Sequence, residues 1–272
     1  MKDYKKLYYE QSCFWDYNYF NVPAEKERLE EIIKIIPSDA RTILDVGCGN
    51  GAFVNIIADI LPKRFDRIVG VDISKEALRY VKVEKYKANI SNLPFKNESF
   101  DLVSSFEVLE HLPQEDFKRG ISELQRVSKK YILITVPNED DLELSLVMCP
   151  KCYCWFNPYF HMRSFNKKSL QNLFEKFNPI KIKEIGPFLE YRSYNHLLLT
   201  FYRVWRKPLP PKTAICPQCG YRYKESSQGI KNNKSSSILL KLLLLFKPLA
   251  KIIWPSKKKK RWLLALYEKS HK

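Results

Sequence analysis

The sequence predicts an α/β fold with a mostly parallel, Rossmann-like sheet, and three observations support this class. The chain has 272 residues, which is enough for one α/β domain and an appendage. Between residues 42 and 136, short apolar segments alternate with amphipathic ones, as expected of parallel βαβ units. A glycine turn, Gly47–Gly51, directly follows the first apolar segment, which is a position where α/β proteins bind cofactors.

The expected elements follow from periodicity and from helix start and stop signals. A helix is expected from Pro23 to Pro37, because its apolar residues recur every three or four positions. The strands and helices expected after it are, in order, strand 42–46, helix 52–61, strand 67–71, helix 75–81, strand 85–88, strand 100–104, helix 113–127, strand 131–136, helix 168–176, strand 180–185 and strand 261–269.

Composition then divides the chain into domains and insertions. Residues 1–23 are rich in aromatic side chains and form either a lid over a pocket or a packed arm. The cofactor-binding core is expected at 24–148 and continues at 162–206. Two cysteine-bearing insertions lie at 149–161 and 207–225, followed by an apolar basic helix at 237–256 and a closing strand at 261–269.

The net charge of +17 favours an anionic partner such as nucleic acid, anionic lipid or an acidic substrate. The alternative is a lysine-rich solvated surface. Residues 238–254 are apolar, with lysines on one side, and Lys257–Arg261 are all basic. This pattern fits a helix lying on an anionic membrane, or equally one packed on the domain or at a dimer interface. Without a secretory signal or a spanning segment, we expect a cytoplasmic protein, with peripheral membrane attachment as the variant.

The strongest motif is Ile43-Leu-Asp-Val-Gly-Cys-Gly-Asn-Gly51. Its spacing differs from the Gly-x-Gly-x-x-Gly of dinucleotide sites and from a Walker loop. The motif resembles that of the class I S-adenosylmethionine-dependent methyltransferases, small-molecule branch. The resemblance implies a seven-stranded sheet with helices on both faces and S-adenosylmethionine as cofactor. The glycines would cradle the methionine end of that cofactor, and the residues implied for this end are Asp45, Gly47, Gly49 and Gly51.

The same resemblance assigns the rest of the cofactor site. Asp72 ends the second strand, where a carboxylate can accept both ribose hydroxyls. Asn89 stands where the family usually has an aspartate for the adenine amino group, and an amide oxygen accepts the same bond. Ile73, Ile90 and Phe106 would line the remaining pocket. The alternative is that Asp45 and Asp72 only cap turns.

A second motif, Glu107-Val-Leu-Glu-His111, follows the fourth strand and resembles the ubiquinone-type O-methyltransferases. His111 is a candidate general base for a hydroxyl acceptor, because its reference pKa lies near neutrality. Glu107 is the second catalytic candidate, lining the acceptor pocket, and Glu110 and His161 are possible further ones. The chain lacks the Asn/Asp-Pro-Pro-Tyr signature of enzymes that methylate base amino groups, which disfavours that acceptor.

This second motif also carries a metal hypothesis. Glu107, Glu110 and His111 are expected on one helical turn, and His161 follows the fifth strand. Small-RNA 3′-terminal 2′-O-methyltransferases hold a divalent ion with a similar set. The alternative, which we favour, is that Glu110 and His111 form a local network and that His161 orients a loop.

Two near-identical cysteine pairs predict a structural zinc site. They are Cys149-Pro-Lys-Cys152 and Cys216-Pro-Gln-Cys219, and two such knuckle turns complete a tetrahedral thiolate site. A disulfide or free thiols are the alternatives, and Cys154 is a spare thiol.

The sequence therefore predicts an S-adenosylmethionine-dependent methyltransferase that acts on a hydroxyl of a small, glycan or lipid-linked acceptor. An RNA ribose 2′-O-methyltransferase with a Glu/His metal site is the second hypothesis. A cofactor-binding regulator or scaffold without turnover is the third.

Overall fold

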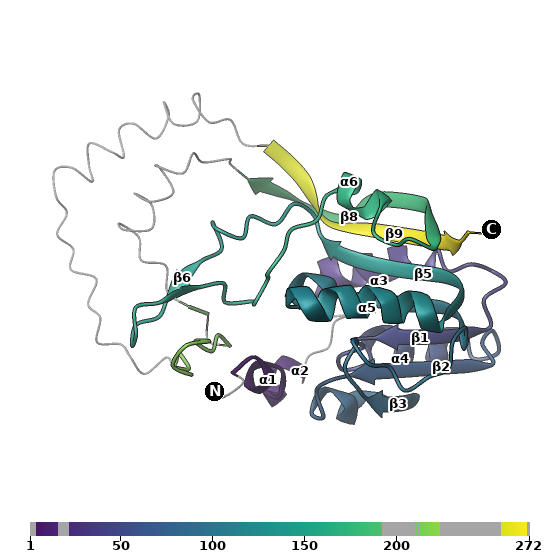
Figure 1. Cartoon of the computed structure of the whole chain (residues 1–272), viewed down its shortest axis with the longest axis horizontal. Helices are drawn as coiled ribbons and strands as arrows, with labels where there is room; N and C mark the ends of the chain where they lie inside the picture. Colours follow the sequence, from purple (N-terminus) through teal and green to yellow (C-terminus); the bar gives the residue numbers. More distant parts are fainter. Residues whose placement is uncertain (1–3, 16–21, 192–209, 212, 224–256, 271–272) are drawn as a thin grey trace.

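The computed structural model describes residues 4–15, 22–191, 210–211, 213–223 and 257–270. Its core is a seven-stranded sheet of order β3-β2-β1-β4-β5-β9-β8 (Figure 1). The first five strands are parallel, and β9 runs antiparallel between β5 and β8. The strand bounds are β1 Thr42–Val46, β2 Arg67–Asp72, β3 Glu84–Lys87, β4 Phe100–Phe106, β5 Ser128–Pro137, β8 Phe177–Tyr191 and β9 Lys257–Lys269. The predicted Rossmann-like fold class is confirmed.

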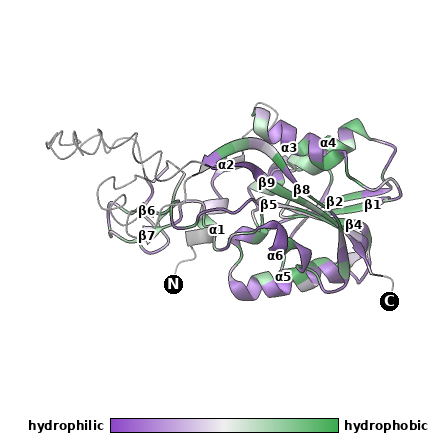
Figure 2. Cartoon of the chain, turned by 90° about the horizontal axis from the view of Figure 1, so that it is seen from above, coloured by the Kyte–Doolittle hydropathy of each residue, from purple (hydrophilic) through white to green (hydrophobic). Residues whose placement is uncertain are grey.

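Helices cover both faces of this sheet, as Figure 2 shows with α3 and α4 on one side and α5 and α6 on the other. Their bounds are α3 Pro23–Ile33, α4 Ala52–Ile60, α5 Gln114–Val127 and α6 Lys167–Gln171. Neighbouring residues of β1 alternate between the two layers: Ile43 packs with α3 and α4, and Leu44 packs with α5 and α6. Burial on both faces explains why β1 is a nearly continuous apolar run.

Three predicted helices are shorter in the structure, and the first of them, α3, ends at Ile33 and not at Pro37. The helix expected at 75–81 is a single 3₁₀ turn, η2 (Ala77–Tyr80), because the chain before it bends back so that the N–H of Ser74 reaches Asp72. The helix expected at 168–176 ends at Gln171. Asn166 and Ser169 cap its start reciprocally, but the chain leaves helical geometry at Asn172.

The last two strands are longer than predicted and include the basic run. Lys257–Lys260 pair with the end of β8, and Arg261 follows them at a shift in the register. The ammonium group of Lys258 lies 3.7 Å from the carboxylate of Glu190, and that of Lys260 lies over the ring of Phe188. This run is therefore part of the sheet. Among the described residues no helix is long and apolar enough to cross a membrane. The expected helix at 237–256 lies outside them.

Two small elements flank the sheet at one end (Figures 1 and 2). The N-terminal arm, residues 4–15, contains α1 (Tyr4–Tyr9) and α2 (Ser12–Trp15). The cysteine module consists of the hairpin β6 (Val147–Met148) and β7 (Trp155–Phe156) together with residues 213–223.

Candidate active site

A pocket of about 670 Å³ opens at the carboxyl ends of β1, β4 and β5. The glycine turn, the second motif and the N-terminal arm line it, together with residues of α3, of β9 and of the segments after β5. Its lining includes Asp45, Gly47, Gly49, Phe106, Glu107, Glu110, His111, His161, Tyr9, Trp15, Arg28, Asp140 and Trp262. The structure thus joins the predicted cofactor turn and the predicted reaction motif in one cavity, where ligands of α/β sheets bind.

The glycine turn is shaped for a close approach of its backbone to a ligand. Gly47 and Gly49 have φ angles of 78° and 55°. A Cβ atom on Gly47 would lie 2.3 Å from a methyl group of Val108, and one on Gly49 would lie 2.8 Å from the ring of Trp15. Any larger residue at these positions would be strained and would collide with its neighbours. The turn fits the expected cradle for the methionine end of the cofactor.

The two predicted acidic residues are buried at this turn. The hydroxyl of Ser104 donates to the carboxylate of Asp45 at 2.7 Å, and burial raises the pKa of Asp45 to about 7. The carboxylate of Asp72 accepts from the backbone N–H groups of Gly49 and Ser74, each at 2.8 Å. Asp72 therefore caps its turn, as the alternative interpretation stated. A carboxylate has about four acceptor sites, so capacity for a ligand hydroxyl remains.

Apart from Phe106, the residues predicted for the adenosine end, Asp72 included, lie outside the pocket lining. The side-chain oxygen of Asn89 accepts from the N–H of Ser91 at 3.0 Å. Ile90 is buried in the core against Gly120, and Ile73 is exposed. Gly51 begins α4 with a φ angle of 81°. Only Phe106 lines the pocket, where its ring meets that of Phe53 edge-on at 5.0 Å.

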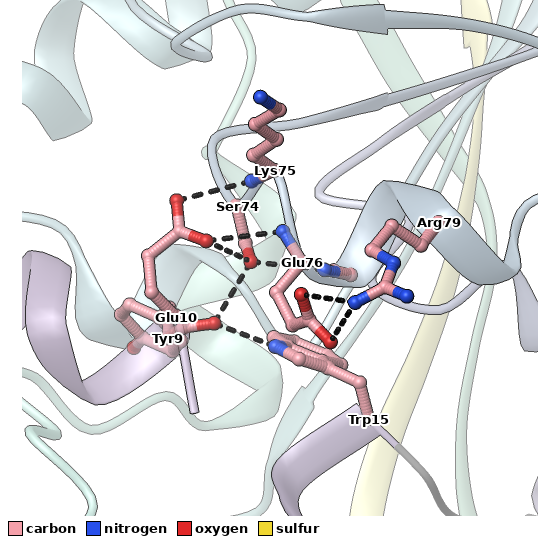
Figure 3. Close-up of polar contacts among 8 residues, drawn as sticks. Tyr9, Glu10, Trp15, Ser74, Lys75, Glu76 and Arg79 are labelled. Carbon is pink, nitrogen blue, oxygen red and sulfur yellow. Dashed lines mark hydrogen bonds and ion pairs between the residues drawn. The ribbon is translucent and has the colours of Figure 1, made fainter. Parts of the chain in front are cut away.

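The N-terminal arm lies across this part of the site (Figure 3). The carboxylate of Glu10 accepts from the backbone N–H groups of Lys75 and Glu76, each at 3.0 Å. The carbonyl of Tyr9 accepts from the hydroxyl of Ser74 at 2.8 Å and from the indole N–H of Trp15 at 2.5 Å. These contacts correspond to the lid interpretation of the aromatic segment.

His161 lies beside Glu110 and His111 of the second motif. One ligand atom from each lies within 4.8 Å of the others. Glu110 is only 1% exposed, and neither of its carboxylate oxygens has a hydrogen-bond partner. Burial, together with the charge of Glu107, raises the pKa of Glu110 well above its usual range. Burial thus favours the protonated form of Glu110, and a cation that forms or binds beside it would favour the ionised carboxylate instead.

Glu107 is set apart from this cluster. The predicted single helical turn is wrong, because the 3₁₀ turn η3 (Leu109–His111) begins after Glu107, which has a φ angle of 56°. The indole N–H of Trp262 donates to its carboxylate at 2.8 Å, and the guanidinium of Arg28 lies 4.0 Å from it. Glu107 lines this pocket but does not belong to the candidate metal-ligand set, although the sequence placed it there.

Two residues of the site escaped prediction. Asp140 lies 2.6 Å from Nδ1 of His161, so this carboxylate orients the ring and fixes its proton on Nδ1. Its signal was available, because acidic residues directly follow the fifth strand, at the edge where ligands bind. Arg28 comes from α3 and is buried between Glu25 and the ring of Trp262. No local pattern marks Arg28, since its partners are distant in sequence.

The cysteine module contains two copies of one turn. In the first, the N–H of Tyr153 donates to the carbonyl of Cys149, and in the second the N–H of Gly220 donates to the carbonyl of Cys216, each at 2.9 Å. Tyr153 and Gly220 both have a positive φ angle, of 60° and 68°. The pairing that closes each turn is also equivalent, between Met148 and Trp155 and between Ile215 and Arg222.

The thiols of these two turns converge on one point. The sulfur atoms of Cys149 and Cys219 are 3.7 Å apart, and those of Cys152 and Cys216 are 3.6 Å apart. Zinc–sulfur bonds of about 2.3 Å in a tetrahedron require sulfur–sulfur distances of about 3.8 Å. Cys154 also approaches Cys216, at 3.3 Å. Its position, however, is that of Tyr221 in the second turn, so the repeat excludes Cys154 from the four equivalent ligands.

The affinity of this site for S-adenosylhomocysteine is expected to depend on pH through Asp45. A cofactor amino group needs the ionised carboxylate, and the pKa of Asp45 is about 7 in the unliganded protein. Below that pH, binding must release a proton from Asp45, so the Kd rises about tenfold for each unit by which the pH is lowered. Above it, the curve is flat. Calorimetric titrations from pH 5.5 to 8 measure this profile, which Asp45→Asn should abolish. A flat profile in the unaltered protein would contradict the assignment.

Known proteins resemble this chain in sequence and in fold. Residues 44–133 match the methyltransferase-domain family. The chain is 31% identical over 142 residues to a probable S-adenosylmethionine-dependent methyltransferase of Mycolicibacterium smegmatis, which covers 50% of each protein. It is 33% identical over 97 residues to the ubiquinone biosynthesis O-methyltransferase of Albidiferax ferrireducens, covering 32% of this chain and 37% of that protein. It is 28% identical over 138 residues to the small RNA 2′-O-methyltransferase of Arabidopsis thaliana, covering 44% and 14%.

A solved structure extends the likeness to the fold. Magnesium protoporphyrin IX methyltransferase from Synechocystis, with bound SAH, superposes with a TM-score of 0.50 at 14% identity, covering 68% of this chain and 94% of that one. The chain therefore carries a class I S-adenosylmethionine-dependent methyltransferase domain, as its sequence predicted. The matched region spans half or less of the length of each of the three curated relatives.

Proposed function

We propose that this chain transfers the methyl group of S-adenosylmethionine to a hydroxyl oxygen of a small, glycan or lipid-linked acceptor. The observation that carries the proposal is the buried carboxylate of Glu110 beside His111 and His161. These groups line the same pocket as the cofactor turn. A hydroxyl group must give up its proton to a nearby group when it is methylated, and this need is weaker for an amine acceptor.

The residues perform two tasks in this reaction. S-adenosylmethionine supplies a methyl group bound to a positively charged sulfur. The acceptor oxygen forms a bond to the methyl carbon while the carbon–sulfur bond breaks and leaves its electron pair on sulfur. His111 takes the hydroxyl proton, and the resulting imidazolium lies beside Glu110, whose carboxylate oxygen is 3.8 Å from Nε2 of His111. The pocket walls hold the acceptor in line with the methyl group.

A second candidate is methylation of an RNA ribose 2′-hydroxyl with a divalent ion at Glu110, His111 and His161. It is favoured by the convergence of their ligand atoms and by Asp140, which orients His161 as carboxylates orient histidine ligands of metals. Such an ion would polarise the acceptor hydroxyl. The likeness to the small RNA 2′-O-methyltransferase points to the same acceptor.

Transfer of a labelled methyl group into fractionated cell extract separates these candidates. Label in the solvent-extractable lipid or glycan pool, insensitive to a chelator, supports the first proposal and would make residues 237–256 a candidate docking segment. Label that is sensitive to ribonuclease and to the chelator supports the second. If the protein binds the cofactor but labels neither pool, both are contradicted and the regulator hypothesis is favoured.

We further propose that Cys149, Cys152, Cys216 and Cys219 hold a structural zinc ion. Two equivalent turns with sulfur spacings close to those of a tetrahedral site support it. The four thiols come from turns far apart in sequence, so the ion would link two segments that otherwise meet in small apolar clusters. Bound zinc of this kind contributes directly to folding stability.

Metal analysis of purified protein is expected to find one zinc ion per chain. Cys149→Ser should lose it, because three thiolates and a hydroxyl bind zinc far more weakly. Cys154→Ser is the matched control and should retain it, since the repeat excludes Cys154 from the ligand set. Loss of zinc from Cys154→Ser alone would contradict the assignment, and a native protein without zinc would refute the site.

A further inference from the structure

The N-terminal arm contacts the cofactor site and the cysteine module at once. Toward the cofactor site, the side-chain amide of Asn50 donates to the carbonyl of Trp15 at 3.0 Å, and the ring of Trp15 covers Gly49. Glu10 binds the backbone after β2, as Figure 3 shows. The arm therefore closes one wall of the pocket, in contact with both segments that the cofactor motifs define.

The other side of the arm rests on the cysteine module. Tyr8 is only 2% exposed and forms one apolar cluster with Phe160 and Ile215. The ring centroids of Tyr8 and Phe160 are 4.9 Å apart. The side-chain amide of Gln11 also donates to the carbonyl of Thr213 at 3.1 Å. Ile215 is fully buried and directly precedes the ligand Cys216, so the second turn of the module supports the arm.

We propose that the zinc-bound module holds the arm closed over the cofactor, so that zinc at the four cysteines and cofactor in the pocket stabilise each other. This inference rests on the zinc site proposed above. Without the ion, the turn before Cys216 loses the link that fixes it to the β6–β7 hairpin, and Tyr8 and Gln11 lose a fixed support. The arm then opens more often and the cofactor dissociates faster.

The coupling has a size and a direction that can be measured. Linked sites in proteins typically change each other's affinity by about 5- to 150-fold. We expect zinc removal to raise the Kd for S-adenosylhomocysteine by about tenfold, mostly through a faster dissociation rate. Reciprocity requires that S-adenosylhomocysteine raise the affinity for zinc by the same factor, which an equilibrium competition with a chelating dye measures.

The test compares four forms of the full-length protein by zinc content, calorimetric Kd for S-adenosylhomocysteine and circular dichroism. They are the unaltered protein, Cys149→Ser, Cys154→Ser and Ile215→Ala. Ile215→Ala keeps all thiols but removes the apolar contact with Tyr8 and Phe160, so it should retain zinc and still weaken binding. Cys154→Ser should match the unaltered protein in both quantities.

The outcomes separate the two proposals. Absence of zinc from the native protein overturns the zinc site and this inference with it. A second outcome is that the unaltered protein binds zinc but the Kd for S-adenosylhomocysteine is unchanged in both Cys149→Ser and Ile215→Ala. That outcome overturns the coupling and leaves the zinc site standing. If Cys149→Ser fails to fold, Ile215→Ala decides alone: weaker cofactor binding with zinc retained supports the coupling, and unchanged binding overturns it.

Discussion

Glu110→Gln and His111→Ala are each expected to lower kcat by roughly 100- to 10,000-fold, the usual contribution of a general acid–base group. The affinity for S-adenosylhomocysteine should stay within about twofold, because neither residue belongs to the cofactor turn. Gln has the size of Glu but no charge, so it cannot stabilise an imidazolium on His111 or bind a divalent ion. A fall in kcat without loss of cofactor binding places these residues at the acceptor.

The measurement is labelled methyl transfer into the accepting extract fraction, alongside calorimetry with S-adenosylhomocysteine. Glu115→Gln is the matched control, because it makes the same chemical change on an exposed side chain of α5. Its kcat should equal that of the unaltered protein. Wild-type turnover in Glu110→Gln would contradict a role for the cluster in the reaction.

Asp72→Asn is expected to raise the Kd for S-adenosylhomocysteine by about 100-fold. The carboxylate makes two charge-assisted hydrogen bonds, to the N–H groups of Gly49 and Ser74. Each such bond contributes about 1.5–3 kcal/mol, and an amide can accept only one of them while its NH₂ group repels the other. The cofactor turn would lose its shape, and the ribose hydroxyls would lose a charged acceptor.

Asp101→Asn provides the control for this variant. Asp101 also accepts two backbone hydrogen bonds, from Arg41 and Thr42 at 3.0 Å each, but at the opposite end of β1. It should lower the melting temperature without changing the Kd. If Asp72→Asn binds S-adenosylhomocysteine as tightly as the unaltered protein, the ribose assignment is wrong.

Most of the sheet could be predicted because it depends on local pattern. Four of the five parallel strands, β1, β2, β4 and β5, contain apolar runs between turn residues, whereas β3 is polar and exposed. Gly47 and Gly49 mark a turn that only glycine can form with these neighbours. The closing strand was also visible, from Arg261 onward. Its first four residues were not, because consecutive lysines have low strand propensity. They become a strand through pairing with the end of β8.

The parts of the site that escaped prediction depend on contacts between distant segments. Glu107 and Glu110 are close in sequence, yet a positive φ angle at Glu107 turns the first toward Trp262 and leaves the second facing His161. The arm is another example. Nothing in the sequence around Gln11 signals that its amide reaches Thr213, because the pairing spans the whole core.

The cofactor site is tested most directly by a crystal structure of the protein with S-adenosylhomocysteine. We expect one molecule per chain in the pocket beneath Trp15, with its amino group on Asp45, its methionine end on the turn at Gly47, and its ribose hydroxyls on Asp72. Its sulfur should face Glu110 and His111. A ligand bound elsewhere, or a protein that does not bind it at millimolar concentration, would contradict the assignment of this pocket.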